Sequence, residues 1–288
     1  MPAVITLSFD PVIRLSETVS IRVETLALAV VLFFGLLLAM RIGSITPSDA
    51  PYVPPPGLRP GDLVLMVFAA IPAAVAGGRL GYVLDHLDYY RAHPEGILDP
   101  THGALPLTLA VPLALLVGAL IGRLIGAPVG RWMHAVALPL LFVLGAGKLI
   151  GVLGATGQGL PTDLPWATAY EGLGPWGSLA PSLPSHPAQV YEALAVGGAL
   201  VVLAMATRLE ALAHRDGAAL YVALGLWALA RIAVGFVWRD PGVIGPLRFE
   251  QLLALGVLAV AVIGFIERTR AAARPAVGRS GSLDAEPI

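Results

Sequence analysis

Long apolar runs alternate along the chain with shorter segments that hold most of its charge. A membrane-spanning helix needs about 20 consecutive, mostly apolar residues with few charges. Seven runs meet this requirement, and polar residues, glycines or prolines separate each from the next. The pattern predicts an all-α, polytopic membrane protein whose seven transmembrane helices cover residues 21–41, 62–84, 105–126, 132–153, 188–207, 217–238 and 249–267.

Composition narrows the class of protein further. Hydrophobic residues make up 57% of the 288 residues and charged residues only 13%, whereas soluble domains carry about 25% charged residues. The 18 Lys and Arg against 19 Asp and Glu give a net charge of -1, so nothing favours a nucleic-acid partner. Because the chain has no cysteine, disulfides, thiolate metal sites and a cysteine nucleophile are excluded. We expect neither a metal nor another cofactor.

The distribution of arginine predicts the orientation. Arginines are concentrated in the segments that lie inside if the N-terminus is outside, and the long loop 154–187 has neither Lys nor Arg. The positive-inside rule therefore predicts an external N-terminus and a cytoplasmic C-terminus. We expect a single transmembrane domain at 1–270, with outward loops at 85–104 and 154–187, and a disordered tail at 271–288.

The second outward loop contains Trp166, Tyr170 and Trp176. Trp and Tyr favour the headgroup level of a bilayer. The aromatics therefore indicate a loop that lies along the membrane surface, and an ordinary interfacial loop explains them equally well.

Charged side chains inside the predicted spans are the main candidates for a functional site. Arg79, Lys148, Glu192 and Arg231 each lie in or at the end of a span, where a charge costs a few kcal/mol unless it has a partner or a function. Three cations near the outer ends could together bind a lipid phosphate. The alternative is ion pairing between helices, such as Arg79 or Arg231 with Glu192.

Two histidines add candidate chemistry. His186 and Pro187 open a helix at the outer surface, and Gln189 and Glu192 follow roughly on one face of it. A capping or loop-anchoring role for His186 is the alternative. His102 directly precedes a span and could remove a proton from a thiol or hydroxyl near neutral pH. Its alternative is a solvated loop histidine.

Several short motifs, in this order, resemble the prolipoprotein diacylglyceryl transferase family over residues 21–265. The most specific are the strings Pro-Thr-Asp-Leu-Pro-Trp ending at Trp166 and His-Pro-x-Gln-x-Tyr-Glu ending at Glu192. The shorter matches are Ile21-Arg22, Gly78-Arg-Leu-Gly-Tyr82, Asp88-Tyr-Tyr-Arg-Ala-His-Pro94, His102-Gly103, Gly145-Ala-Gly-Lys148, Arg231, Trp238-Arg-Asp-Pro241 and Glu250-Gln251.

The resemblance implies an enzyme of the bacterial cytoplasmic (inner) membrane with its N-terminus outside. Members transfer the diacylglyceryl group of phosphatidylglycerol to the lipobox cysteine of a preprolipoprotein signal peptide, forming a thioether and releasing glycerol 1-phosphate. Phosphatidylglycerol, the signal peptide and the lipid bilayer are then the expected partners, and we expect a monomer. The substrate supplies the cysteine that this chain lacks.

Site residues follow from the same resemblance. It implies that His102 is a base for the thiol and that Arg231 and Lys148 hold the lipid phosphate. The other matched positions, expected to bind substrate, are Arg79, His186, Gln189, Tyr191 and Glu192.

The chain departs from the family pattern at several positions. It has Lys148 and Leu160 where arginines are usual, Gly235 where a glutamate is usual, Glu24 where a tyrosine is usual, and Ala104 where a glycine is usual. Lysine keeps the charge but loses the bidentate guanidinium fork. Two alternatives therefore stay open: a related enzyme acting on another phospholipid or acceptor, and a non-catalytic lipid-binding or transport paralogue.

Overall fold

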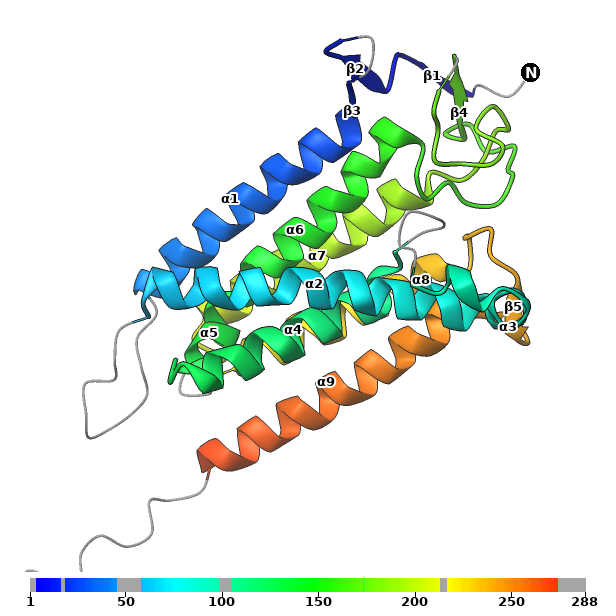
Figure 1. Ribbon diagram of the computed structural model, residues 1–288. Helices are drawn as coiled ribbons and strands as arrows, with labels where there is room; N and C mark the ends of the chain where they lie inside the picture. Colours follow the sequence, from blue (N-terminus) through cyan, green and yellow to red (C-terminus); the bar gives the residue numbers. More distant parts are fainter. Residues whose placement is uncertain are drawn as a thin grey trace, which may run out of the picture.

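Seven long apolar helices form the body of the protein (Figure 1). The computed structural model describes residues 4–16, 19–45, 58–98, 105–172, 174–212 and 217–273. Within these ranges the seven helices long and apolar enough to cross a membrane match the seven predicted spans. They are α1 (Val23–Ile45), α2 (Pro60–Asp85), α4 (Leu107–Leu124), α6 (Ala137–Ile150), α7 (Ala188–Arg208), α8 (Ala218–Gly235) and α9 (Phe249–Ala273).

The fourth predicted span is divided into two helices. A short helix, α5 (Val129–Ala135), ends where α6 begins, with Val136 between them. Pro139 lies in the first turn of α6 and has no N–H to donate to the carbonyl of Ala135, so one hydrogen bond of the helical ladder is missing at this point. The membrane-crossing part is therefore α6 with the following 3-10 turn η2 (Gly151–Gly154).

Short elements gather at one end of the bundle, which we call the loop end; α1, α7 and α9 begin there and α2 and α8 end there (Figure 1). Two short helices follow α2, and three two-stranded sheets use segments predicted only as loops or chain ends. These elements are α3 (Leu87–Ala92), η1 (Pro94–Gly96), β1 (Ile5–Ser8), β2 (Val12–Arg14), β3 (Ser20–Arg22), β4 (Thr168–Glu171), β5 (Gly242–Ile244) and β6 (Leu247–Arg248).

One of the sheets joins the N-terminal segment to the long loop 154–187. β1 pairs in parallel with β4, in a register that sets Ile5 opposite Thr168 and Ser8 opposite Glu171. The loop is therefore an ordered cover of the loop end. Strands of three or four residues give too short an alternation to be distinguished from loops in the sequence.

The centre of the bundle is α8. It packs against α5, α6, α7 and α9, and the largest side chains of the surrounding core, among them Leu141, Leu203 and Trp227, are almost completely buried. Side chains on α8 are thus held away from lipid, which is why a charge near its end can be retained.

The closest helix pair is α2 with α4, and small residues make it possible. A Cβ on Gly77 would lie 2.6 Å from the carbonyl oxygen of Leu109, and one on Gly78 would lie 2.9 Å from the Cβ of Leu105. The glycines before Arg79 therefore serve close backbone approach, as small residues do in membrane bundles.

The outer faces of the helices are apolar. Phe33 and Phe34 on α1 and Ile263 on α9 are each more than half exposed, which suits contact with lipid tails. The chain is therefore a multi-pass membrane protein. The side of the membrane on which each end lies stays a prediction. Helix α9 continues to Ala273, past residue 271 where the disordered tail was predicted to begin. Residues 274–288 lie outside the described ranges, and the tail there stays a prediction.

Candidate functional site

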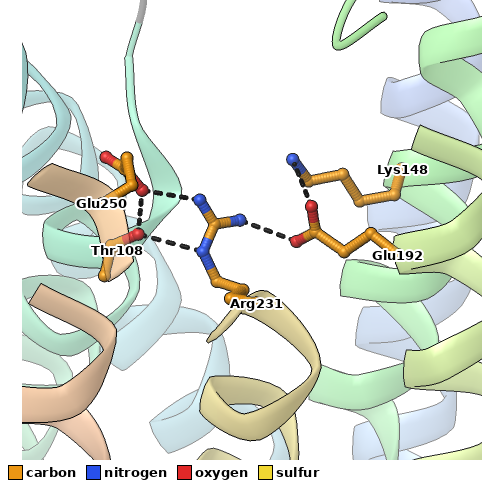
Figure 2. Close-up of polar contacts among 5 residues, drawn as sticks. All are labelled: Thr108, Lys148, Glu192, Arg231 and Glu250. Carbon is orange, nitrogen blue, oxygen red and sulfur yellow. Dashed lines mark hydrogen bonds and ion pairs between the residues drawn. The ribbon is translucent and has the colours of Figure 1, made fainter. Parts of the chain in front are cut away.

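A buried charged network lies at the loop end, centred on Arg231 near the C-terminal end of α8 (Figure 2). The guanidinium Nη1 pairs with Oε1 of Glu192 at 2.7 Å, and Nη2 pairs with Oε2 of Glu250 at 2.6 Å. Nε donates to the hydroxyl of Thr108 at 3.0 Å. That hydroxyl in turn donates to Glu250. Four helices, α4, α7, α8 and α9, therefore meet at one guanidinium.

Lys148 extends the network to a fifth helix, α6. Its Nζ lies 3.0 Å from Oε2 of Glu192, the oxygen that Arg231 does not use. The Glu192 side chain is only 1% exposed, whereas that of Lys148 is 24% exposed. One buried carboxylate thus holds two cations side by side, and the lysine is the partner that reaches toward the surroundings.

The network is balanced in charge. It contains two cations, Lys148 and Arg231, and two carboxylates, Glu192 and Glu250. A buried charge is tolerated when it is paired and hydrogen-bonded. The ion pair between Arg231 and Glu192, stated above as the alternative to a phosphate site, is present.

Two tryptophans fix the plane of the central guanidinium. The Cζ of Arg231 lies 4.8 Å from the ring centroid of Trp238 and 5.5 Å from that of Trp227. Cation–π contacts of this kind favour a desolvated arginine and limit its rotation. The aromatic contacts thus set which edge of Arg231 meets a ligand.

Arg79 lies apart from this network in its described contacts. Its Nε donates to the carbonyl of Ile97 at 2.8 Å, and Nη2 donates to the Tyr90 hydroxyl at 2.8 Å and to the carbonyl of Gly96. Two of the three cations expected in one cluster, Lys148 and Arg231, meet at Glu192, and a place for Arg79 in the same site stays a prediction. Close packing of α2 on α4 turns Arg79 toward α3 and η1, where it holds the segment that leads into residues 99–104.

His102 falls within residues 99–104 and lies outside the described ranges. Its assignment as the base stays a prediction. The structure bears on it only through Arg79, which binds the chain just before this segment.

His186 and Tyr191 form a separate polar chain with the long loop. Nδ1 of His186 lies 3.3 Å from the Tyr191 hydroxyl, which also accepts a hydrogen bond of 2.6 Å from Nε1 of Trp166. The arrangement anchors the loop to the start of α7, as the alternative interpretation of His186 predicted.

Gln189, a buried residue in the first turn of α7, also contacts the long loop. Its Nε2 donates to the hydroxyl of Tyr170 at 3.1 Å. Tyr170 is 1% exposed, and burial raises the pKa of its phenol to about 12. Tyr170 is therefore a neutral packing residue, in contrast to the headgroup position expected for the loop aromatics.

Sequence reasoning assigned no role to two members of the network, Glu250, which it matched only as a family motif position, and Thr108, which it did not single out. Glu250 lies in the first turn of α9, where an acidic residue is ordinarily explained by the helix dipole. Thr108 is completely buried in the first turn of α4, and a neutral threonine in an apolar span gives no charge signal. Only the meeting of the helices identifies them.

An apolar cavity of about 320 Å³ lies deeper in the bundle than the network. It is lined by α1, α2, α4, α5, α6 and α8, and its lining includes Leu36, Met66, Ala114, Trp132 and Val143. Along α6, Val143 precedes Lys148 by five residues, which is about 7.5 Å of helix. Cationic groups and apolar space are therefore stacked along the same helices.

Two departures from the family pattern have different surroundings. At Gly235, a Cβ would lie 2.5 Å from Cγ of Gln251, so α9 fills the space that a larger side chain would need. Leu160 is 39% exposed, and its backbone N–H donates to the carbonyl of Val237 at 2.7 Å. Nothing in the structure explains the choice of leucine there.

The fold and this network define a multi-pass membrane protein with a buried, cation-bearing site at one end of its bundle. A sequence profile described as prolipoprotein diacylglyceryl transferase matches residues 12–267. The chain belongs to the prolipoprotein diacylglyceryl transferase family.

Individual relatives agree with the profile, and each is named phosphatidylglycerol--prolipoprotein diacylglyceryl transferase. The protein from Nitrobacter hamburgensis is 32% identical over 240 residues, covering 81% of this chain and 77% of its own. The one from Nitratidesulfovibrio vulgaris is 32% identical over 216 residues, covering 73% and 77%. The one from Rhodospirillum centenum is 32% identical over 250 residues, covering 84% of both.

Proposed function

We propose that this chain transfers the diacylglyceryl group of phosphatidylglycerol to the cysteine thiol of a preprolipoprotein. The names of its relatives supply the two substrates. The observation that carries the proposal for this chain is the pair of cations, Lys148 and Arg231, held on the two oxygens of Glu192 at the loop end.

The two cations retain hydrogen-bond donors for a phosphate. A guanidinium has five N–H donors and an ammonium has three. The described partners of Arg231 take one donor on each of its three nitrogens, and Lys148 turns one toward Glu192. The remaining pair on Nη1 and Nη2 matches two phosphate oxygens. Lys148 adds a second charge to the same ligand.

The apolar cavity suits the acyl chains of the same lipid. Its lining residues on α4 and α6, such as Ala114 and Val143, lie about 7–10 Å along the helices from Thr108 and Lys148. Cavities of about 300–1,000 Å³ are typical of small-molecule sites. A phosphodiester at the cations would therefore direct its glycerol backbone and an acyl chain toward the cavity.

The cations also match the charge change of the reaction. The C–O bond to phosphate breaks as the C–S bond forms, and the phosphate changes from a monoanionic diester to a more highly charged monoester. Arg231 and Lys148 stabilise this developing charge in a water-poor site. The proton of the thiol passes to a base, for which His102 is our candidate.

The other predicted residues organise the surroundings of the site. Arg79 positions the segment before His102, while His186, Tyr191 and Gln189 hold the long loop over the start of α7. We assign the protein to the bacterial cytoplasmic membrane with the loop end outward, because the segments at the opposite end carry most of the arginines, as cytoplasmic segments do. The N-terminus would then lie outside.

Complementation of a bacterial strain depleted of its own transferase tests this function. Expression of the wild-type chain should restore growth, and isolated membranes should attach labelled diacylglycerol from phosphatidylglycerol to a lipobox peptide. R231A and K148A should each lose the transfer. R123A, which removes an exposed arginine near the opposite end of α4, should keep it. A well-expressed wild-type chain that lipidates nothing would refute the proposal.

A further inference from the structure

The phosphate-binding edge of Arg231 lies beside two carboxylates. Nη1 is paired with Glu192 at 2.7 Å and Nη2 with Glu250 at 2.6 Å. An incoming phosphodiester therefore adds a third negative charge to a network that is neutral without it. Like charges placed together in a desolvated site cost several kcal/mol, so one carboxylate has to give way when the lipid binds.

The two carboxylates are held very differently. Glu192 is 1% exposed, and both of its oxygens contact a cation. Glu250 is 12% exposed and pairs with Arg231 through Oε2 only. Its Oε1 is buried and has no hydrogen-bond partner within the described ranges. Glu250 is therefore the carboxylate that is easier to displace.

The backbone of α9 does not depend on the Glu250 contact. The next residue, Gln251, is completely buried. Its Oε1 accepts a hydrogen bond of 2.9 Å from the backbone of Arg248, and its Nε2 donates to the carbonyl of Ile232 at 2.8 Å. The start of α9 is thus fastened to α8 through Gln251, and the side chain of Glu250 can turn away without releasing the helix.

Thr108 connects the two states of the site. Its hydroxyl accepts from Nε of Arg231 and donates to Glu250. When Glu250 turns away, the same O–H can donate to an oxygen of the incoming phosphate. The hydrogen bond is then transferred from one anion to the other and no buried donor is left unpaired.

We infer that Glu250 is an internal counter-anion that occupies Arg231 in the lipid-free site and is displaced from it by the lipid phosphate. The inference rests on the proposed function, because it takes a phosphodiester lipid as the ligand of Arg231. In this arrangement the Glu250 carboxylate holds Arg231 in place, and it lowers the affinity of Arg231 for every anionic ligand.

The test is the KM-against-kcat split of E250Q, an almost isosteric change that removes the charge. The KM for phosphatidylglycerol and the inhibition constant of glycerol 1-phosphate should each fall about tenfold, with kcat no higher than in the wild type. E171Q is the matched control, since Glu171 is an exposed carboxylate of β4. Its constants should equal those of the wild type.

Other outcomes overturn the inference. An unchanged KM and inhibition constant would mean that Glu250 does not compete with the ligand. A raised KM would mean that Glu250 presents Arg231 to the phosphate. A lower kcat at constant KM would place Glu250 in the chemical step. Should E250Q fail to accumulate in membranes, E250D keeps the charge on a shorter side chain, and the same two constants should fall by a smaller factor.

Binding separates this inference from the proposed function. Glycerol 1-phosphate can be bound to the detergent-solubilised chain and measured without any transfer reaction. Tighter binding to E250Q than to the wild type supports the inference even where the wild type transfers nothing. Equal binding contradicts it even where the transferase activity is present.

Discussion

Glu192 is the residue on which the two cations depend, and its substitution by glutamine gives the sharpest stability prediction. Its carboxylate is 1% exposed and lies 3.0 Å from Nζ of Lys148 and 2.7 Å from Nη1 of Arg231. E192Q keeps the shape but leaves two neighbouring cations with one carboxylate, Glu250. Removing one partner from a buried ion pair costs about 3–5 kcal/mol.

We expect the lower end of that range, about 3 kcal/mol, because Lys148 is 24% exposed and can move toward water. The corresponding fall in the unfolding midpoint is about 6–12 °C. Thermal unfolding in detergent or lipid nanodiscs would measure it. E95Q removes a carboxylate that is 74% exposed at the same end, and it should leave the midpoint unchanged.

A second substitution distinguishes charge imbalance from a loss of packing. K148M in the E192Q background restores a balanced pair, Arg231 with Glu250. The double variant should unfold at a higher temperature than E192Q alone, although it should not regain transfer, because one phosphate-binding cation is gone. An E192Q midpoint equal to that of the wild type, or no recovery in the double variant, would refute the argument from charge balance.

Two further predictions concern the cavity and the long loop. A114F fills the apolar cavity and should raise the KM for long-chain phosphatidylglycerol about tenfold, equivalent to about 1.4 kcal/mol, without changing the KM for short-chain lipid. L116F changes the exposed face of the same helix and is the control. Equal kinetics in the two variants would count against an acyl chain in the cavity. Burial raises the pKa of Tyr170 to about 12, so the folded state holds the phenol proton more strongly than the unfolded state does, and the free energy of unfolding should fall as the pH rises from about 10 to about 12. Y170F should lack this part of the pH dependence in unfolding experiments. The same dependence of unfolding free energy on pH in Y170F and the wild type would show that the phenol is not buried in solution.

Much of the fold could be predicted because its signals are local. An apolar run of about 20 residues specifies a membrane helix by itself, and five of the seven spans were placed within four residues at each end. The fourth span is one exception, because the boundary at Val136 between α5 and α6 falls inside a single long apolar run. The last span is the other, because α9 continues six residues past its predicted end.

The site could be predicted only in part because it depends on distant contacts. Lys148, Glu192 and Arg231 were identified as candidates because a charge inside a membrane span is costly. In the structure both cations form ion pairs with Glu192. Which way Arg79 turns depends on how closely α2 packs on α4, and no spacing in the sequence gives that. Glu250 was matched as a motif position but given no role, because an acidic residue in the first turn of a helix has an ordinary explanation.

The departure at Gly235 shows the same limit. The sequence shows that a side chain is missing there, but only the packed bundle shows that Gln251 fills the space and that Glu250 brings a carboxylate to Arg231 from the next helix. The second carboxylate that balances the charge of the network therefore comes from α9 and not from α8 itself.

A structure of the protein in nanodiscs that contain phosphatidylglycerol would test most directly whether Arg231 and Lys148 bind the same lipid phosphate. The account predicts density for one phosphate within hydrogen-bonding distance of Nη1 and Nη2 of Arg231 and of Nζ of Lys148, with an acyl chain in the cavity beside Ala114. A headgroup bound elsewhere, such as at Arg79, with both cations still closed on Glu192 and Glu250, would contradict it.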